Sequence, residues 1–405
     1  MSAVPYPTAP GSFPGLDDDA AARVRSVREI AREIAGPAAE AVDRDARFPR
    51  EALSALAAAR LLSARVPVRD GGFGAGMVEL GLMCEALGQR CASAAMVFAM
   101  HQVQVACLVR HGRSRFFEDY LGELVGQQRL IASVTSEAGV GGSVRTSICP
   151  IEPLPDGRCR VRKEGTVVSY GDDADDLLLT VRRSAESVPG DQALVLVRKA
   201  ACEIVHTGSW DAMGMRGTCS PGMRISAEFD PVQIVPAPFA DINAYTMVPW
   251  AHTLWSSVWL GIATDAVARA RAFVRDTARI GGTTPPTAAR LSEVSTRLQL
   301  MRVQVREATR HHDAIEAQPD GGVDALSSLA SAVQLNHLKL STSELVAAIC
   351  TAALRIAGTA GYRNDSPYSI ARHLRDAHSA ALMIGNERIH AANAPLQMVY
   401  RDDAL

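Results

Sequence analysis

An excess of one charge, clustered cysteines and long apolar runs are all missing from this sequence. The 42 lysines and arginines nearly balance the 44 aspartates and glutamates, and no basic tract offers a footprint for nucleic acid. No run of 18 or more apolar residues is present, so no membrane-spanning helix is predicted. The eight cysteines are scattered and none forms a CxxC pair, which disfavours a zinc site or a disulfide framework. A reducing, cytoplasmic location is therefore expected.

The start of the chain also lacks a targeting pattern. Residues 1–18 are rich in Pro, Gly and Ser, and they have neither a basic start nor an apolar core. They are not expected to act as a secretory signal, and we predict a flexible arm.

Helical periodicity is present over residues 19–128. The segment AAARVRSVREIAREIAG places apolar side chains on one face and charges on the other, and its helix is predicted to end where Gly36 precedes Pro37. A second helical segment, REALSALAAARLL, is followed by the glycine-rich turn DGGFGAG. These features predict an N-terminal helical domain.

The pattern changes twice along the rest of the chain. Residues 129–238 contain short β-type runs such as RLIASV, DLLLTVRR and QALVLVRK, separated by Gly, Pro and Asp clusters. Over residues 239–405 the helical period returns, and ARLSEVSTRLQLMRVQVREATRHH repeats apolar positions at steps of three and four. The predicted fold class is α+β, mostly α: an N-terminal helical domain, a central β domain (antiparallel barrel or sandwich) and a C-terminal helical bundle.

Seven local strings occur in an order that resembles the acyl-CoA dehydrogenase family of flavoproteins. They are VPVRDGGFGAG, CEALGQRCASAAM, ASVTSEAGVGGS, GTVVSYGDDADDLLL, MGMRGTCSPGMRI, GTAGY and RHLRDA. The resemblance runs over nearly the whole chain, and it implies an FAD cofactor, an acyl thioester substrate on CoA or a carrier protein, and a homodimer or homotetramer. It does not name the electron acceptor.

The resemblance also assigns candidate cofactor residues. Thr135 and Ser136 match the loop that approaches the flavin, Ser169 matches a threonine beside its N5 edge, and Ser143 ends the glycine loop. Hydroxyls suit this place because reduction puts negative charge on that side of the ring. The alternative for each is an ordinary turn hydroxyl that caps its own loop.

Three further residues match contacts that the family makes with the outer half of FAD from a neighbouring subunit. They are Arg279, Arg355 and Thr359, and an arginine suits a diphosphate through its fork of donors. The alternative is an arginine on a helix surface near the C-terminus of its helix.

The glutamate that removes the Cα proton in this family has no counterpart in the sequence. Ile384 occupies its commonest position, and no glutamate lies between Glu228 and Glu293, where a second version carries it. A base must be titratable and within hydrogen-bond reach of the proton. His252 is one candidate replacement, unless it is a helix histidine that is packed or solvated near a tryptophan. Glu387 is another, unless it only stabilises the start of its helix.

Other polar residues near these positions have weaker claims. Asp241 and Tyr245 are further candidate bases, while Asn386 and Arg388 replace family residues at the flavin edge. The adjacent pair His311 and His312 resembles metal ligands, but neighbouring helix residues point apart, so a solvated face and no metal are expected.

Three functions remain open from the sequence. The first is an FAD-dependent dehydrogenase of acyl thioesters, with a displaced base or a substrate whose proton is already acidic. The second is a flavin-dependent monooxygenase or oxidase, which needs no Cα base. The third is a non-catalytic flavoprotein that keeps the fold as a scaffold.

Overall fold

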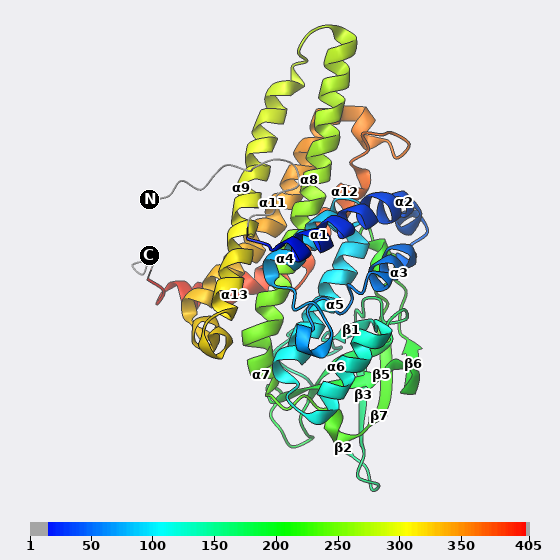
Figure 1. Cartoon of the computed structure of the whole chain (residues 1–405), viewed down its shortest axis with the longest axis vertical. Helices are drawn as coiled ribbons and strands as arrows, with labels where there is room; N and C mark the ends of the chain where they lie inside the picture. The colour runs from blue at the N-terminus through cyan, green and yellow to red at the C-terminus, as the bar shows by residue number, and fades with distance from the viewer. Residues whose placement is uncertain (1–14, 402–405) are drawn as a thin grey trace.

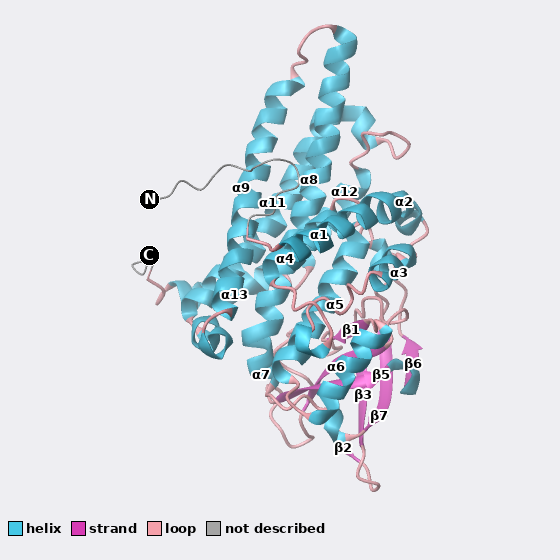
Figure 2. Cartoon of the chain, viewed as in Figure 1, coloured by secondary structure: helices cyan, strands magenta, loops and turns pink. Residues whose placement is uncertain are grey.

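The computed structural model describes residues 15–401, so most of the predicted arm lies outside the described residues. Helices form the two ends of the described chain and strands lie between them, which confirms the predicted fold class (Figures 1 and 2).

The N-terminal part of the chain is helical, and its first helix continues past the predicted end at Pro37. They are α1 (Asp18–Ile30), η1 (Ala31–Ala35), α2 (Gly36–Arg44), α3 (Arg50–Ala58), α4 (Met77–Gly88), α5 (Ala92–His111) and α6 (Arg115–Gln127). The prediction that the first helix ends at Pro37 is wrong, because η1 is a π-helical turn that continues directly into α2. Pro37 lies in the first turn of α2, where a missing N–H is tolerated.

Seven strands form two small sheets in the central part of the chain. They are β1 (Ile131–Val134), β2 (Glu152–Pro153), β3 (Cys159–Gly165), β4 (Asp176–Arg182), β5 (Gln192–Arg198), β6 (Cys202–His206) and β7 (Met223–Phe229). The sheets have the orders β1-β4-β5 and β2-β3-β7-β6. All pairings are antiparallel except that of β1 with β4, which is parallel. The apolar runs of β4 and β5 are buried on both faces, whereas β3 and β7 alternate between buried and more exposed positions.

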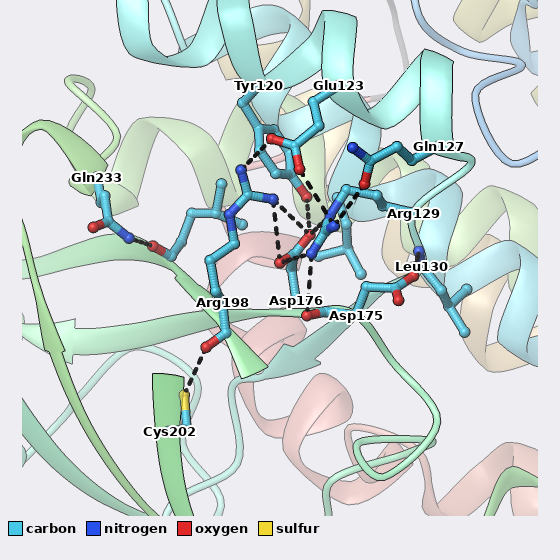
Figure 3. A network of polar contacts seen from close by, with 12 residues as sticks. Tyr120, Glu123, Gln127, Arg129, Leu130, Asp175, Asp176, Arg198, Cys202 and Gln233 are labelled. Carbon is cyan, nitrogen blue, oxygen red and sulfur yellow. Dashed lines mark hydrogen bonds and ion pairs between the residues drawn. The ribbon is translucent and has the colours of Figure 1, made fainter. Parts of the chain in front are cut away.

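A buried carboxylate joins the N-terminal helices to the sheets. Asp176, at the start of β4, is fully buried and accepts hydrogen bonds from the hydroxyl of Tyr120 (2.7 Å) and from Nε and Nη2 of Arg129 (2.6 and 2.7 Å). Arg198 of β5 approaches the same carboxylate at 3.5 Å and also pairs with Glu123 of α6 (Figure 3). The position of β1 beside β4 is thereby fixed relative to α6.

Helices return after β7. They are α7 (Phe239–Ile242), η6 (Asn243–Met247), α8 (Val248–Gly281), α9 (Thr287–Glu316), α10 (Val323–Ser327), α11 (Leu329–Tyr362), α12 (Ala371–Leu382) and α13 (Asn386–Gln397). Figure 1 shows the long helices α8, α9 and α11 packed side by side, as the predicted bundle requires. Gly358 interrupts α11 with a positive φ of 58°, which glycine tolerates.

The first half of α8 is buried on every side because it packs against α4, α5, α9 and α11. Two described helices, α5 and α11, are long and apolar enough to cross a membrane by length and composition alone, a test that core helices of soluble proteins also pass. The apolar window of α5 is 89% buried inside the molecule, as in a core helix, whereas that of α11 is 39% buried.

Candidate functional site

A cavity of about 310 Å³ lies where the three parts of the chain meet. Its walls come from α5, the loop after β1, the segments around residues 167 and 218, η6, the start of α8, and the turn between α12 and α13. Most of the lining is apolar and includes Met96, Met100, Val103, Met247 and Trp255. Such a cavity, with few polar groups, is typical of a small-molecule site.

Three of the predicted cofactor residues line this cavity together. Thr135 and Ser136 follow β1, and Ser169 approaches from the segment after β3. The Ser136 hydroxyl donates to the carbonyl of Val167 (2.8 Å) and accepts from its N–H (3.0 Å). These residues are far apart in the sequence, so the resemblance predicted their meeting correctly, while their contact with a flavin remains a prediction.

A series of hydrogen-bonded hydroxyls orients the Ser169 side chain. Ser220 Oγ donates to Ser169 Oγ at 2.9 Å, and the hydroxyls of Thr218 and Ser220 lie 2.8 Å apart. Thr218 and Ser220 also line the cavity, although no sequence pattern indicated them. With Thr135 and Ser136, they give this part of the wall a row of hydroxyl groups, which suits the polar edge of a flavin ring.

Ile384 also lines the cavity, in a strained backbone conformation. Its φ is +60°, which a β-branched residue rarely adopts, and Gly385 follows with a φ of +68°. Met215, another lining residue, also has a left-handed φ of 52°. Strain of this kind costs on the order of 1–3 kcal/mol and is concentrated at functional sites.

Asn386 does not take the predicted place at the cavity edge. Its Oδ1 accepts from Nζ of Lys339 at 2.5 Å, and its Nδ2 donates to the Ser343 hydroxyl at 3.1 Å. Lys339 is fully buried on α11, and this burial lowers the pKa of its ammonium group to about 8. The side chain of Asn386 therefore anchors the turn after Ile384, and no sequence pattern indicated that the lysine would be buried.

None of the candidate bases lines the cavity. His252 is buried on α8, where its Nδ1–H donates to the carbonyl of Leu335 (3.2 Å), and burial lowers its pKa to about 4. Asp241 and Tyr245 flank the lining residue Asn243 without lining the cavity themselves. Glu387 is exposed in the first turn of α13, which agrees with its structural alternative.

The absence of titratable groups extends to the whole wall. Among the described residues, those that line the cavity include no carboxylate, imidazole, amine, guanidinium, thiol or phenol. Two lining residues carry buried polar atoms without a protein partner, Gln104 Oε1 and Trp255 Nε1. Because an unpaired buried polar group costs about 1–3 kcal/mol, polar atoms of a bound ligand are the natural partners for these two.

The remaining predicted cofactor residues do not line the cavity, although Gly142 and Val144, on either side of Ser143, do. Ser143 lies in the glycine loop, where its hydroxyl accepts from the N–H of Arg145, and Arg388 donates to the carbonyl of Gly141 in the same loop. Arg279, Arg355 and Thr359 are exposed on α8 and α11. Their predicted role requires a second copy of the chain, so it stays a prediction.

The expectation of a solvated histidine pair is wrong for His312. Its side chain is buried against Trp250, with ring centroids 5.3 Å apart, and burial lowers its pKa to about 3. Ligand atoms of His312, Asp313 and Glu316 lie within 4.8 Å of one another. Both carboxylates already serve the protein, because Asp313 accepts two backbone N–H groups at the start of α4 and Glu316 pairs with Arg65. We assign no metal to this group.

Comparison with known families identifies the fold's relatives. The family description "Acyl-CoA dehydrogenase, N-terminal domain" matches residues 17–128, and "Acyl-CoA dehydrogenase, C-terminal domain" matches residues 249–394. This chain belongs to the acyl-CoA dehydrogenase family. A curated member, the cyclohex-1-ene-1-carbonyl-CoA dehydrogenase of Geobacter metallireducens, is 22% identical over 372 residues, which cover 90% of this chain and 93% of that protein.

Solved structures of two different enzymes share the fold. FMN-bound TdsC from Paenibacillus sp. A11-2, a dibenzothiophene monooxygenase, has a TM-score of 0.80 at 19% identity, covering 93% of this chain and 98% of that one. Butyryl-CoA dehydrogenase from Megasphaera elsdenii has a TM-score of 0.81 at 17% identity, covering 96% and 100%. The fold of this acyl-CoA dehydrogenase family member therefore occurs both in a monooxygenase and in a dehydrogenase.

Proposed function

We propose that this acyl-CoA dehydrogenase family member is a flavin-dependent monooxygenase or oxidase that acts on an apolar substrate with O2. The observation that carries the proposal is the lack of any titratable side chain among the described residues that line the cavity. Removal of a Cα proton needs a base within hydrogen-bond reach, whereas oxygen transfer from a reduced flavin does not. The monooxygenase TdsC, which has the same fold, supports the proposal.

The residues present fit a flavin. The hydroxyls of Thr135, Ser136 and Ser169 would hold the polar edge of the ring, and a bound flavin, once reduced, supplies the two electrons that activate O2. Met100, Val103 and Ile384 would hold the apolar body of the substrate and exclude water from the reacting corner. In the monooxygenase reaction one oxygen atom enters the substrate, the other leaves as water, and NADH with a separate flavin reductase supplies the electrons.

The test is a reconstituted reaction under 18O2. Purified protein is expected to bind flavin. In the monooxygenase reaction turnover is expected to need a flavin reductase, NADH and O2, with one labelled oxygen atom in the product. In the oxidase reaction the substrate itself reduces the flavin, so turnover is expected to need O2 alone and to release labelled hydrogen peroxide. Turnover in the absence of O2 would exclude the proposal, and turnover with O2 but without NADH and the reductase would exclude its monooxygenase form. A colourless preparation that takes up neither FMN nor FAD would exclude every flavin-dependent function.

A second candidate is the dehydrogenation of an acyl thioester on CoA or a carrier protein. The family match and the cyclohex-1-ene-1-carbonyl-CoA dehydrogenase favour it. It would need a substrate with an already acidic Cα proton, because the cavity supplies no base. Anaerobic mixing of the oxidised protein with a panel of acyl thioesters would bleach the flavin under this candidate, and no bleaching with any of them would argue against it.

The cofactor is proposed to be FAD shared between two copies of the chain. Arg279, Arg355 and Thr359 are exposed and would complete the outer half of the site of a neighbouring copy. The apolar α11, with only 39% of its window buried, and the exposed side chains of Leu300 and Val303 on α9 support an association surface. Light scattering of the flavin-loaded protein tests the oligomer, and chromatography of the released cofactor distinguishes FAD from FMN.

A further inference from the structure

A second cavity, of about 520 Å³, lies next to the apolar cavity, and residues of α12 line both. The two cavities share walls: Met213 and Arg375 line the second one, whereas Met215 and Ser379 line the first. The second cavity differs in its chemistry. Its lining contains five arginines but only two carboxylates. The arginines are Arg44, Arg216, Arg269, Arg372 and Arg375, and the carboxylates are Glu40 and Asp43. We call it the arginine cavity.

Three of these guanidinium groups are held in place by the fold. Arg375 donates Nη1 to Asp43 Oδ1 (2.9 Å) and to the carbonyl of Met213 (2.8 Å). Arg216 donates Nε to the carbonyl of Asp43 (2.8 Å), and Arg269 donates Nε to Asp265 (2.8 Å). Because these side chains are already ordered, a ligand would lose little rotamer entropy by binding to them.

Several donors in this cavity remain unused. Among the residues that the structure describes, Nη2 of Arg216 and Nη2 of Arg269 donate to no acceptor. Arg372 makes one hydrogen bond, from Nη2 to the carbonyl of Arg90 (3.0 Å), and forms no ion pair with a described residue. A guanidinium carries five N–H donors, so these three groups together offer several free ones to a ligand.

A buried histidine adds a further unpaired group. His373 is 5% exposed and lines the arginine cavity, with Nε2 2.8 Å from Asp265 Oδ2. Its Nδ1 is buried and has no partner among the described residues. The cavity thus contains an unsatisfied polar atom in addition to the free arginine donors.

The acidic groups around the cavity are mostly neutralised. Asp43 pairs with Arg375, Asp265 with Arg269, and Asp211, which is 86% exposed, with Arg216. An exposed ion pair such as that of Asp211 is weak, so an incoming anion can compete with it. Glu40 is exposed and forms no ion pair with a described residue, so it is the carboxylate that would oppose an anion.

We propose that the arginine cavity binds a phosphoryl anion, either free or as the phosphorylated end of a larger ligand. Planar guanidinium forks match phosphate oxygens in pairs, which is why arginine is preferred over lysine where a phosphate is bound through several donors. The site lies outside the apolar cavity, so its test does not depend on the proposed reaction.

The proposal is tested by calorimetric titration of the flavin-loaded protein with inorganic pyrophosphate at constant ionic strength. Saturable binding is expected, and Arg372→Gln is expected to weaken it about tenfold or more, since a hydrogen bond to a charged group is lost. The matched control is Arg275→Gln, which removes one exposed charge from α8 outside the cavity. No saturable binding, or equal weakening by both variants, would overturn the proposal.

A second variant provides an independent test if Arg372→Gln perturbs folding. Glu40→Gln removes the opposing charge from an exposed side chain and is expected to tighten pyrophosphate binding about two- to fivefold. Unchanged or weaker binding in this variant would contradict the assigned site. ADP serves as the second ligand. If the protein binds ADP more tightly than pyrophosphate, and Arg372→Gln loses this binding, the natural ligand is a larger phosphorylated molecule. If ADP and pyrophosphate bind equally, the natural ligand is the free anion.

Discussion

Replacement of Asp176 by asparagine is expected to loosen the joint between the N-terminal helices and the sheets. The carboxylate is fully buried and accepts from Tyr120 and twice from Arg129, at 2.6–2.7 Å. The amide side chain would keep the shape, but it would remove the negative charge that both Arg129 and Arg198 face. Loss of one partner of a buried ion pair costs about 3–5 kcal/mol. Since domains are stable by only about 5–15 kcal/mol, the change is large.

The assay is urea denaturation followed by circular dichroism, together with the affinity for flavin. The D176N variant is expected to unfold at clearly lower urea concentration and to bind flavin more weakly, because β1 pairs with β4 at Asp176 and leads directly to Thr135. The control is Asp156→Asn, which breaks an exposed pair with Arg158 and should shift the urea midpoint little, because exposed ion pairs contribute little to stability. A loss no larger than the control's would refute the reasoning.

Further expectations concern the site and its supports. His252→Asn should change the turnover rate less than about threefold, since His252 lies outside the cavity, and a rate loss of a hundredfold would restore it as a base. Burial lowers the pKa of Lys339 to about 8, below its unfolded value, so stability should rise with pH between about 8 and 10.5, and Lys339→Met should abolish this rise in denaturation midpoints. Gly142→Ala should weaken flavin binding measured by fluorescence, because φ is +75° and an added Cβ would meet Arg388, whereas Gly208→Ala, in open space, should not. If the cavity retains dehydrogenase geometry, Ile384→Glu should allow acyl thioesters to bleach the flavin, because it restores a carboxylate. Ile384→Gln, which cannot accept the proton, should not.

The sequence predicted the order of the three parts well because periodicity reports which faces are buried. It failed at Pro37, where a π-helical turn carries the chain past a residue that usually stops a helix. It also missed the parallel pairing of β1 with β4, since strand direction depends on how distant segments meet.

Part of the candidate site was also predicted from the sequence. The resemblance correctly brought Thr135, Ser136, Ser169 and Ile384 to one cavity. It misplaced His252, because the first half of α8 is buried on every side and its pattern cannot show which residue faces the cavity. Asn386 was misplaced because its partner, Lys339, is a charged residue that a sequence pattern assigns to the surface.

The sequence by itself determined the family, the helical and strand segments, and the loss of the carboxylate at Ile384. Only the tertiary structure decided that no other titratable group replaces it among the described residues, because that depends on which side chains from several distant segments line one cavity. The tertiary structure also decided the strained turn at Ile384 and the convergence of arginines from α2, α8, α12 and the loop before β7. Local sequence preferences disfavour the strained turn and give no sign of the convergence, since long-range packing imposes both.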